Sequence, residues 1–152
     1  MGVLSDAQYN VLVAFLAENI EPNTEKHGVE ILVGLFKKSK SSQMLFEKFK
    51  NLATEAEMRN CPELKKHGDL VVKTLLSVIK KKGSHESELR KLACSHVNQH
   101  KIPVEEFQVI FSVINDYLRT VPACTADISN SMNTVLDDIY DCLKEHYKKE
   151  KK

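Results

Sequence analysis

The chain has 152 residues, of which 22 are basic and 21 are acidic, so its formal net charge at pH 7 is +1. This length predicts one domain over residues 1–152, and the balanced charge argues against a nucleic-acid partner. Glycine and proline number only 5 and 4, too few for the many turns of a β-sandwich or barrel, so the composition favours an all-α fold.

Two helices are predicted in the first 38 residues. Ser5 and Gln8 form a capping box for the first helix, and apolar residues at helical spacing follow them. This helix should end before Pro22. The second is predicted over residues 24–38, and the serine-rich stretch 39–42 indicates that helical structure ends there.

A corner and two further helices are predicted next. The turn-rich corner holds Phe46 and Phe49. Thr54 and Glu57 form a second capping box, which predicts a short helix. A long helix is predicted over residues 61–82, because proline at position 62 suits a first helical turn.

Three more helices are predicted in the rest of the chain. Residues 83–84 are predicted to end the long helix and to cap the next one. That next helix should end before Pro103. Another helix should begin at Pro103 and break at residues 121–122. Thr125 is expected to cap the last helix. The lysine-rich segment 144–152 is predicted to be its solvated end, where cations are favourable.

The four cysteines form no recognisable metal or disulfide motif. They lack CxxC spacing and lie at Cys61, Cys94, Cys124 and Cys142. Residues 1–6 lack the basic and apolar regions of a signal peptide, and no apolar run reaches the roughly 18 residues of a membrane span. We therefore expect reduced thiols in a cytoplasmic protein with no membrane partner.

Two of the six histidines fall on apolar helix faces. His67 shares its face with Leu64, Val71, Leu75 and Val78. His96 shares its face with Leu89, Leu92 and Ala93. Measured along the helices, the corner between them is ~22 Å from His67 and ~17 Å from His96. The two imidazoles can therefore face each other at similar depth.

Buried imidazoles need hydrogen-bond partners or a metal. Taken singly, each histidine also fits a hydrogen-bonded core position, and His96 could share a metal with His100, although His100 is expected to be exposed. Zinc fits poorly, because the neighbours supply no third or fourth ligand. Iron in a macrocycle needs only one protein ligand, so haem with one histidine below the iron and one above satisfies the pattern.

Several segments resemble the globin family, and within it the vertebrate myoglobins. Residues 63–68 (ELKKHG) are similar to the distal-histidine motif, and residues 92–103 (LACSHVNQHKIP) are similar to the proximal one. The resemblance covers nearly the whole chain and implies an all-α globin fold of seven to eight helices around one haem pocket. It also implies that Gly28 lets the second and fifth major helices approach closely. Further similar segments are 4–6, 35–36, 46–50 and 80–83.

The resemblance implies a haem b cofactor, iron protoporphyrin IX. It implies that His96 coordinates the iron and that His67 lies over the bound ligand. Ser95 is implied to hydrogen-bond to the ligating imidazole or a propionate, and Lys48 and His100 to meet propionates. The residues implied to line the pocket are Leu32, Phe46, Val71, Leu92, Ile102, Phe107 and Ile110.

The function implied by the resemblance is reversible binding of dioxygen, for oxygen storage, transport or facilitated diffusion, in a cytoplasmic monomer. Other diatomic gases are expected at the same site, and a hydrogen bond from His67 is expected to stabilise bound oxygen by about 1–3 kcal/mol. One alternative is enzymatic activity as a nitric oxide dioxygenase, nitrite reductase or peroxidase. Another is a bis-histidine haem redox sensor, because Lys40 replaces the family's usual proline and favours a mobile corner.

Overall fold

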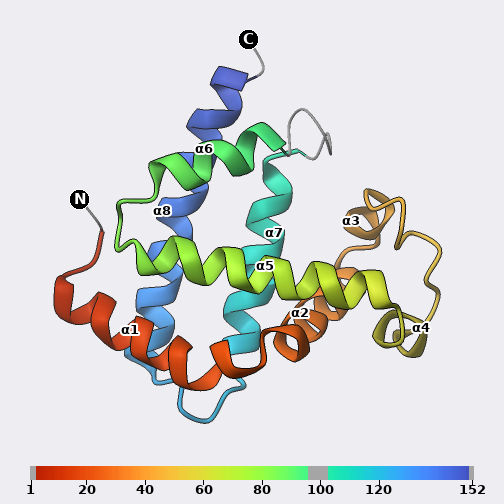
Figure 1. Ribbon diagram of the computed structural model, residues 1–152, viewed down its shortest axis with the longest axis horizontal. Coiled ribbons are helices and arrows are strands. Elements are labelled where there is room, and N and C mark those ends of the chain that lie inside the picture. The colour runs from red at the N-terminus through yellow and green to blue at the C-terminus, as the bar shows by residue number, and fades with distance from the viewer. Residues whose placement is uncertain (1–2, 96–102, 151–152) are drawn as a thin grey trace.

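Figure 1 shows the computed structural model of the chain, which describes residues 3–95 and 103–150. Within these residues all regular structure is helical and no strand is present, so the predicted all-α class is confirmed. The elements in chain order are α1 (Asp6–Asn19), η1 (Glu21–Asn23), α2 (Thr24–Lys38), α3 (Lys40–Met44), α4 (Glu55–Arg59), α5 (Pro62–Lys80), α6 (Glu86–Ser95), α7 (Glu105–Leu118) and α8 (Ala126–Glu150).

The predicted caps explain where several helices begin. Ser5 and Gln8 form the predicted capping box of α1. Thr54 accepts a hydrogen bond from the backbone of Glu57 at the start of α4. Thr125 accepts one from the backbone of Ile128 at 3.2 Å at the start of α8. These side chains satisfy backbone N–H groups that have no partner within the helix.

Two predicted boundaries are wrong. The serine-rich stretch is not a simple loop, because Ser39 caps the short helix α3 by accepting a hydrogen bond from the backbone of Ser42 at 3.2 Å. The helix expected at Pro103 begins at Glu105 instead. Serine is common both in loops and at helix caps, so the composition of the serine-rich stretch did not distinguish a loop from a capped helix.

The corner between α5 and α6 is also longer than predicted. α5 ends at Lys80, because Lys82 and Gly83 adopt left-handed backbone conformations, with φ of 52° and 100°. α6 then begins at Glu86, so residue 84 does not directly precede it.

Among the described residues, no helix combines the length and the apolar character that a membrane span requires.

Helices α2 and α5 cross at a pair of glycines. A Cβ atom on Gly28 would lie 2.2 Å from the backbone carbon of Gly68, and a Cβ on Gly68 would lie 2.6 Å from the backbone carbon of Gly28. Only residues without a side chain permit this approach. The predicted role of Gly28 in bringing these two helices together is therefore confirmed.

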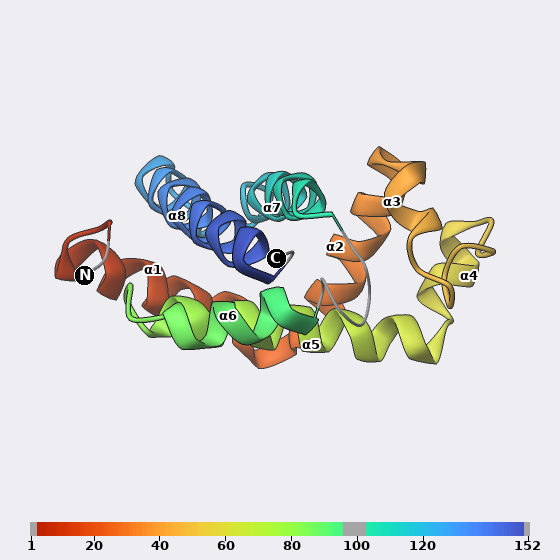
Figure 2. The same cartoon turned by 90° about the horizontal axis from the view of Figure 1, so that it is seen from above.

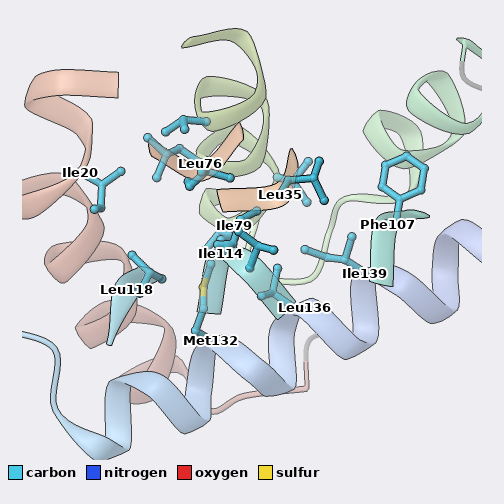
Figure 3. Packing of buried hydrophobic residues seen from close by; sticks show 14 of the residues in the cluster. Ile20, Leu35, Leu76, Ile79, Phe107, Ile114, Leu118, Met132, Leu136 and Ile139 are labelled. Atoms are coloured by element: carbon cyan, nitrogen blue, oxygen red, sulfur yellow. The ribbon is translucent and has the colours of Figure 1, made fainter. Parts of the chain in front are cut away.

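The helices form two layers around a single core. Figure 2 shows α1, α5 and α6 on one side and α7 and α8 on the other, with α2 beside α7 and running from α5 toward α3. Figure 3 shows side chains of α7 and α8 meeting those of α2 and α5. Core residues labelled there are Ile20, Leu35, Leu76, Ile79, Phe107, Ile114, Leu118, Met132, Leu136 and Ile139. The core therefore lies beside the α2–α5 crossing and fixes how α5 is rotated about its axis.

Candidate functional site

The imidazole of His67 on α5 lies against two aromatic rings. Its centroid is 5.4 Å from the ring of Phe46, in an edge-to-face arrangement, and 5.8 Å from the ring of Phe49. Phe36 of α2 is fully buried behind them, 5.6 Å from Phe46 and 6.1 Å from Phe49. Such ring pairs have preferred geometries, so this aromatic cluster limits the orientation of the histidine.

A tight turn places both phenylalanines beside His67. The backbone N–H groups of Phe49 and Lys50 both donate to the carbonyl of Phe46, at 2.9 and 2.8 Å. Gln43 donates from its side chain to the carbonyls of Phe49 and Leu52. The corner was expected from the sequence, but the role of Gln43 was missed, because an isolated glutamine in a polar stretch carries no distinctive pattern.

His67 and Val71 lie one turn apart on α5 and are half-buried. The most buried face of α5 is one residue further along, because Gly68 is the point of contact with α2. The sequence pattern predicted that His67 faces the core, but the residue lies at the margin of the core. Leu32, which was predicted to line the same pocket, is fully buried in the core. The fully or largely buried residues of α5 are Leu64, Gly68, Val72, Leu76, Val78 and Ile79.

The predicted proximal residues flank the end of α6 and the start of α7. Leu92 on α6 and Ile110 on α7 are half-buried. Phe107 is buried, with its ring 6.0 Å from Phe111 and 6.1 Å from Tyr147 of α8. Tyr147 is itself buried, and this burial raises the pKa of its phenol to about 12, so the group stays neutral.

Helix α6, which precedes the predicted proximal ligand, is held against α8 at its start. His85 is buried, and its Nε2 lies 3.1 Å from a carboxylate oxygen of Asp138 on α8. Further along the same helix face, Leu89 and Ala93 are fully buried. These contacts hold α6 against α8.

Some predicted site residues lie outside the part that the structure describes. These are His96, His100 and Ile102, together with the side chain of Ser95. Lys48 is described and is exposed on the turn between Phe46 and Phe49. The structure therefore brings Phe46 against His67 in the first half of α5 and places Val71 one turn further along that helix. Leu92 lies on α6, and Phe107 and Ile110 lie on α7.

Within the described residues, no three histidine, cysteine, aspartate or glutamate side chains gather into a metal site. The four cysteines are free thiols, as expected from their spacing. A metal held near His67 by described side chains alone would therefore lack the ligand number that zinc requires. A group that brings its own donor atoms is consistent with this set of residues.

Two cavities elsewhere on the surface are lined by polar and charged groups. One, of about 460 Å³, lies between the start of α2 and the end of α5 and includes Thr24, Lys73 and Lys80. The other, of about 290 Å³, lies between α7 and α8. In the first, Lys73 pairs with Asp69 and Lys80 pairs with Glu21, so its cations are neutralised locally. Neither cavity includes a predicted site residue.

One family model matches the chain. The family is described as Globin, and the match covers residues 29–143, which is more than half of the chain. It runs from α2 into α8 and includes both predicted histidines, His67 and His96.

Proposed function

Because this chain belongs to the globin family, whose members bind haem and diatomic gases, we propose that it binds dioxygen reversibly for oxygen storage or facilitated diffusion. We further propose one domain over residues 1–152, acting as a cytoplasmic monomer most similar to vertebrate myoglobins, with haem b as cofactor. The observation that carries the proposal is the imidazole of His67 in the first half of α5, packed against the rings of Phe46 and Phe49.

The described residues suit a haem group in their chemistry. Half-buried apolar or aromatic side chains come from the turn and from three helices, at Phe46, Val71, Leu92 and Ile110. A flat, largely apolar macrocycle is retained by such side chains with few polar contacts. When bound, haem supplies a ferrous iron with a position for a diatomic ligand.

Separate residues are proposed for the iron, the proximal wall and the propionates. His96 is proposed to coordinate the iron through a neutral imidazole, with Ser95 accepting its other N–H or meeting a propionate. Leu92, Ile102, Phe107 and Ile110 form the proximal wall. Lys48 and His100 meet the propionates at the rim, where the exposed position of Lys48 is suitable.

On the other side, His67 is proposed to donate an N–H to the gaseous ligand. A hydrogen bond to a partly charged acceptor contributes about 1–3 kcal/mol. Phe46 and Val71 exclude water from the same space, with Leu32 packed behind them. Exclusion of water and donation from His67 together slow loss of the electron to oxygen, which keeps binding reversible.

The structure around Lys40 favours this proposal over the bis-histidine alternative. A mobile corner would let His67 move onto the iron. Instead, Lys40 begins α3, Ser39 caps that helix, and Gln43 is bonded to the turn that follows. These contacts support a fixed corner and a histidine that stays above the ligand. Turnover of nitric oxide, nitrite or peroxide would use the same pocket and is secondary in this proposal.

Replacing His96 with glycine tests the proposed ligand. We expect the His96→Gly variant to lose haem readily to an acceptor apoprotein, because the only protein bond to the iron is gone, and free imidazole should restore haem retention. The matched comparison is His100→Gly, which removes only a proposed propionate contact and should lose haem far more slowly than His96→Gly. Unchanged haem retention in His96→Gly would overturn the assignment.

A further inference from the structure

Helix α3 carries two adjacent polar side chains inside the protein. Ser42 and Gln43 are each only 1% exposed. Ser42 donates its one hydroxyl hydrogen to the carboxylate of Glu106 on α7, and its Oγ accepts from the hydroxyl of Ser39 at 2.8 Å. Gln43 instead contacts the turn that follows α3. Buried polar side chains are costly unless they are hydrogen-bonded, so the two residues have separate roles that their contacts identify.

The orientation of the Gln43 amide is fixed by its partners. Its Nε2 atom donates to the carbonyl oxygens of Phe49 and Leu52, both at 2.8 Å. Carbonyls only accept hydrogen bonds, so the amino group must face both of them. Its Oε1 atom is buried and finds no partner among the described residues. An unpaired buried acceptor costs stability, and the two hydrogen bonds donated by Nε2 offset that cost.

The turn bonded to Gln43 is the one that carries the aromatic contacts of His67. Phe49 accepts from Gln43 through its carbonyl, and its ring lies 5.8 Å from the imidazole. Phe46 lies 5.7 Å from Phe49 and 5.4 Å from His67. The backbone of Gln43 is also bonded to this turn, because the N–H of Phe46 donates to the carbonyl of Gln43 at 3.1 Å.

We propose that Gln43 is a positioning residue for His67. It fixes the turn over residues 46–52, and the turn holds the rings of Phe46 and Phe49 against the imidazole. This restricts His67 to orientations in which its N–H meets the gaseous ligand. The inference rests on the proposed function, since it assumes that His67 is the distal donor.

This role of Gln43 should affect the binding of dioxygen more than the binding of carbon monoxide. Dioxygen gains strongly from a hydrogen-bond donor because it takes up negative charge on binding, whereas carbon monoxide takes up little. A looser turn lets the imidazole leave its donating orientation more often. Loss of Gln43 should therefore accelerate release of dioxygen much more than release of carbon monoxide.

The test uses Gln43→Met in the full-length holoprotein, since methionine has a similar size and lacks both donors. We expect dioxygen dissociation to become about three- to tenfold faster, as for partial loss of one hydrogen bond, and carbon monoxide dissociation to change by less than about twofold. The matched control is Ser42→Ala, which removes the adjacent buried polar group but no contact to the turn, and which should leave both rates near those of the wild type. Gln43→Leu replaces the methionine variant if that protein does not fold.

The same substitution in a His67→Leu background tests whether Gln43 acts through His67 or only stabilises the fold. His67→Leu alone should accelerate dioxygen dissociation roughly five- to hundredfold, and Gln43→Met should add no further acceleration in that background. Nuclear Overhauser contacts between the rings of His67 and Phe49 in the carbon monoxide complex should weaken in Gln43→Met and persist in Ser42→Ala.

The failures are distinguishable. An unchanged dioxygen rate in Gln43→Met, or an equal acceleration with and without His67, would overturn the role of Gln43 alone. An unchanged dioxygen rate in His67→Leu would overturn the distal assignment in the proposed function, and the role of Gln43 with it.

Discussion

His67 and His27 show how differently single imidazoles are held in this fold. His67, in the first half of α5, packs against aromatic rings and is proposed to act on a ligand. His27 on α2 is half-buried and shares a 2.5 Å hydrogen bond with the hydroxyl of Tyr117 on α7. Burial lowers the pKa of His27 from its usual 6.5, and nearby Lys26 lowers it further, against a hydrogen bond to the backbone of Asn19 that raises it.

This lowered pKa makes part of the stability depend on pH. Below about pH 6.5 the unfolded chain takes up a proton at His27 more readily than the folded one, so the free energy of unfolding should decrease as the pH falls. We expect His27→Gln to lose less unfolding free energy than the wild type between about pH 7.5 and pH 5.5. Urea denaturation at the two pH values measures this, and an equal loss in both proteins would contradict the role of His27.

At the scale of elements, the crossing of α2 and α5 is the contact most sensitive to substitution. A methyl group on Gly28 would lie 2.2 Å from the backbone of Gly68, which cannot move aside without separating the helices. A methyl group on Gly34, also in α2, would meet only a side-chain atom of Val113, at 3.3 Å.

Both alanine substitutions gain about 1 kcal/mol of helix propensity, so their difference isolates the clash. Gly28→Ala should lower the free energy of unfolding by about 1–3 kcal/mol or more, whereas Gly34→Ala should leave it within about 1 kcal/mol of the wild type. Chemical denaturation of the two variants provides the comparison. Equal unfolding free energies would show that the crossing adjusts to a side chain.

Local chemistry made the helices predictable, but their contacts were less so. The caps at Ser5, Thr54 and Thr125 are local hydrogen bonds, and they were predicted from short motifs. α3 was not predicted, because a serine-rich stretch suits a loop and a cap equally well. The face of α5 was misjudged by one residue, because the contact with α2 is made by Gly68, which has no apolar side chain to reveal it.

At the scale of the whole molecule, the residues proposed to line the pocket come from distant segments. Phe46 comes from the turn after α3, Val71 from α5, and Ile110 from α7. Helical periodicity indicates which face of a helix is apolar, but it does not say which two helices meet. The globin resemblance supplied that missing information, and the family match over residues 29–143 supports it. Neither helical periodicity nor the globin resemblance indicated the hydrogen bonds from Gln43 to the turn.

The central claim is that haem is held by His96 alone, with His67 above an open ligand position. The optical spectrum of the reduced, ligand-free holoprotein tests it most directly, because an axial ligand on each side of the iron changes the spin state. The fixed corner around Gln43 predicts a five-coordinate, high-spin spectrum. A six-coordinate, low-spin spectrum that reverts to five-coordinate in His67→Leu would contradict the claim and assign His67 as a second ligand.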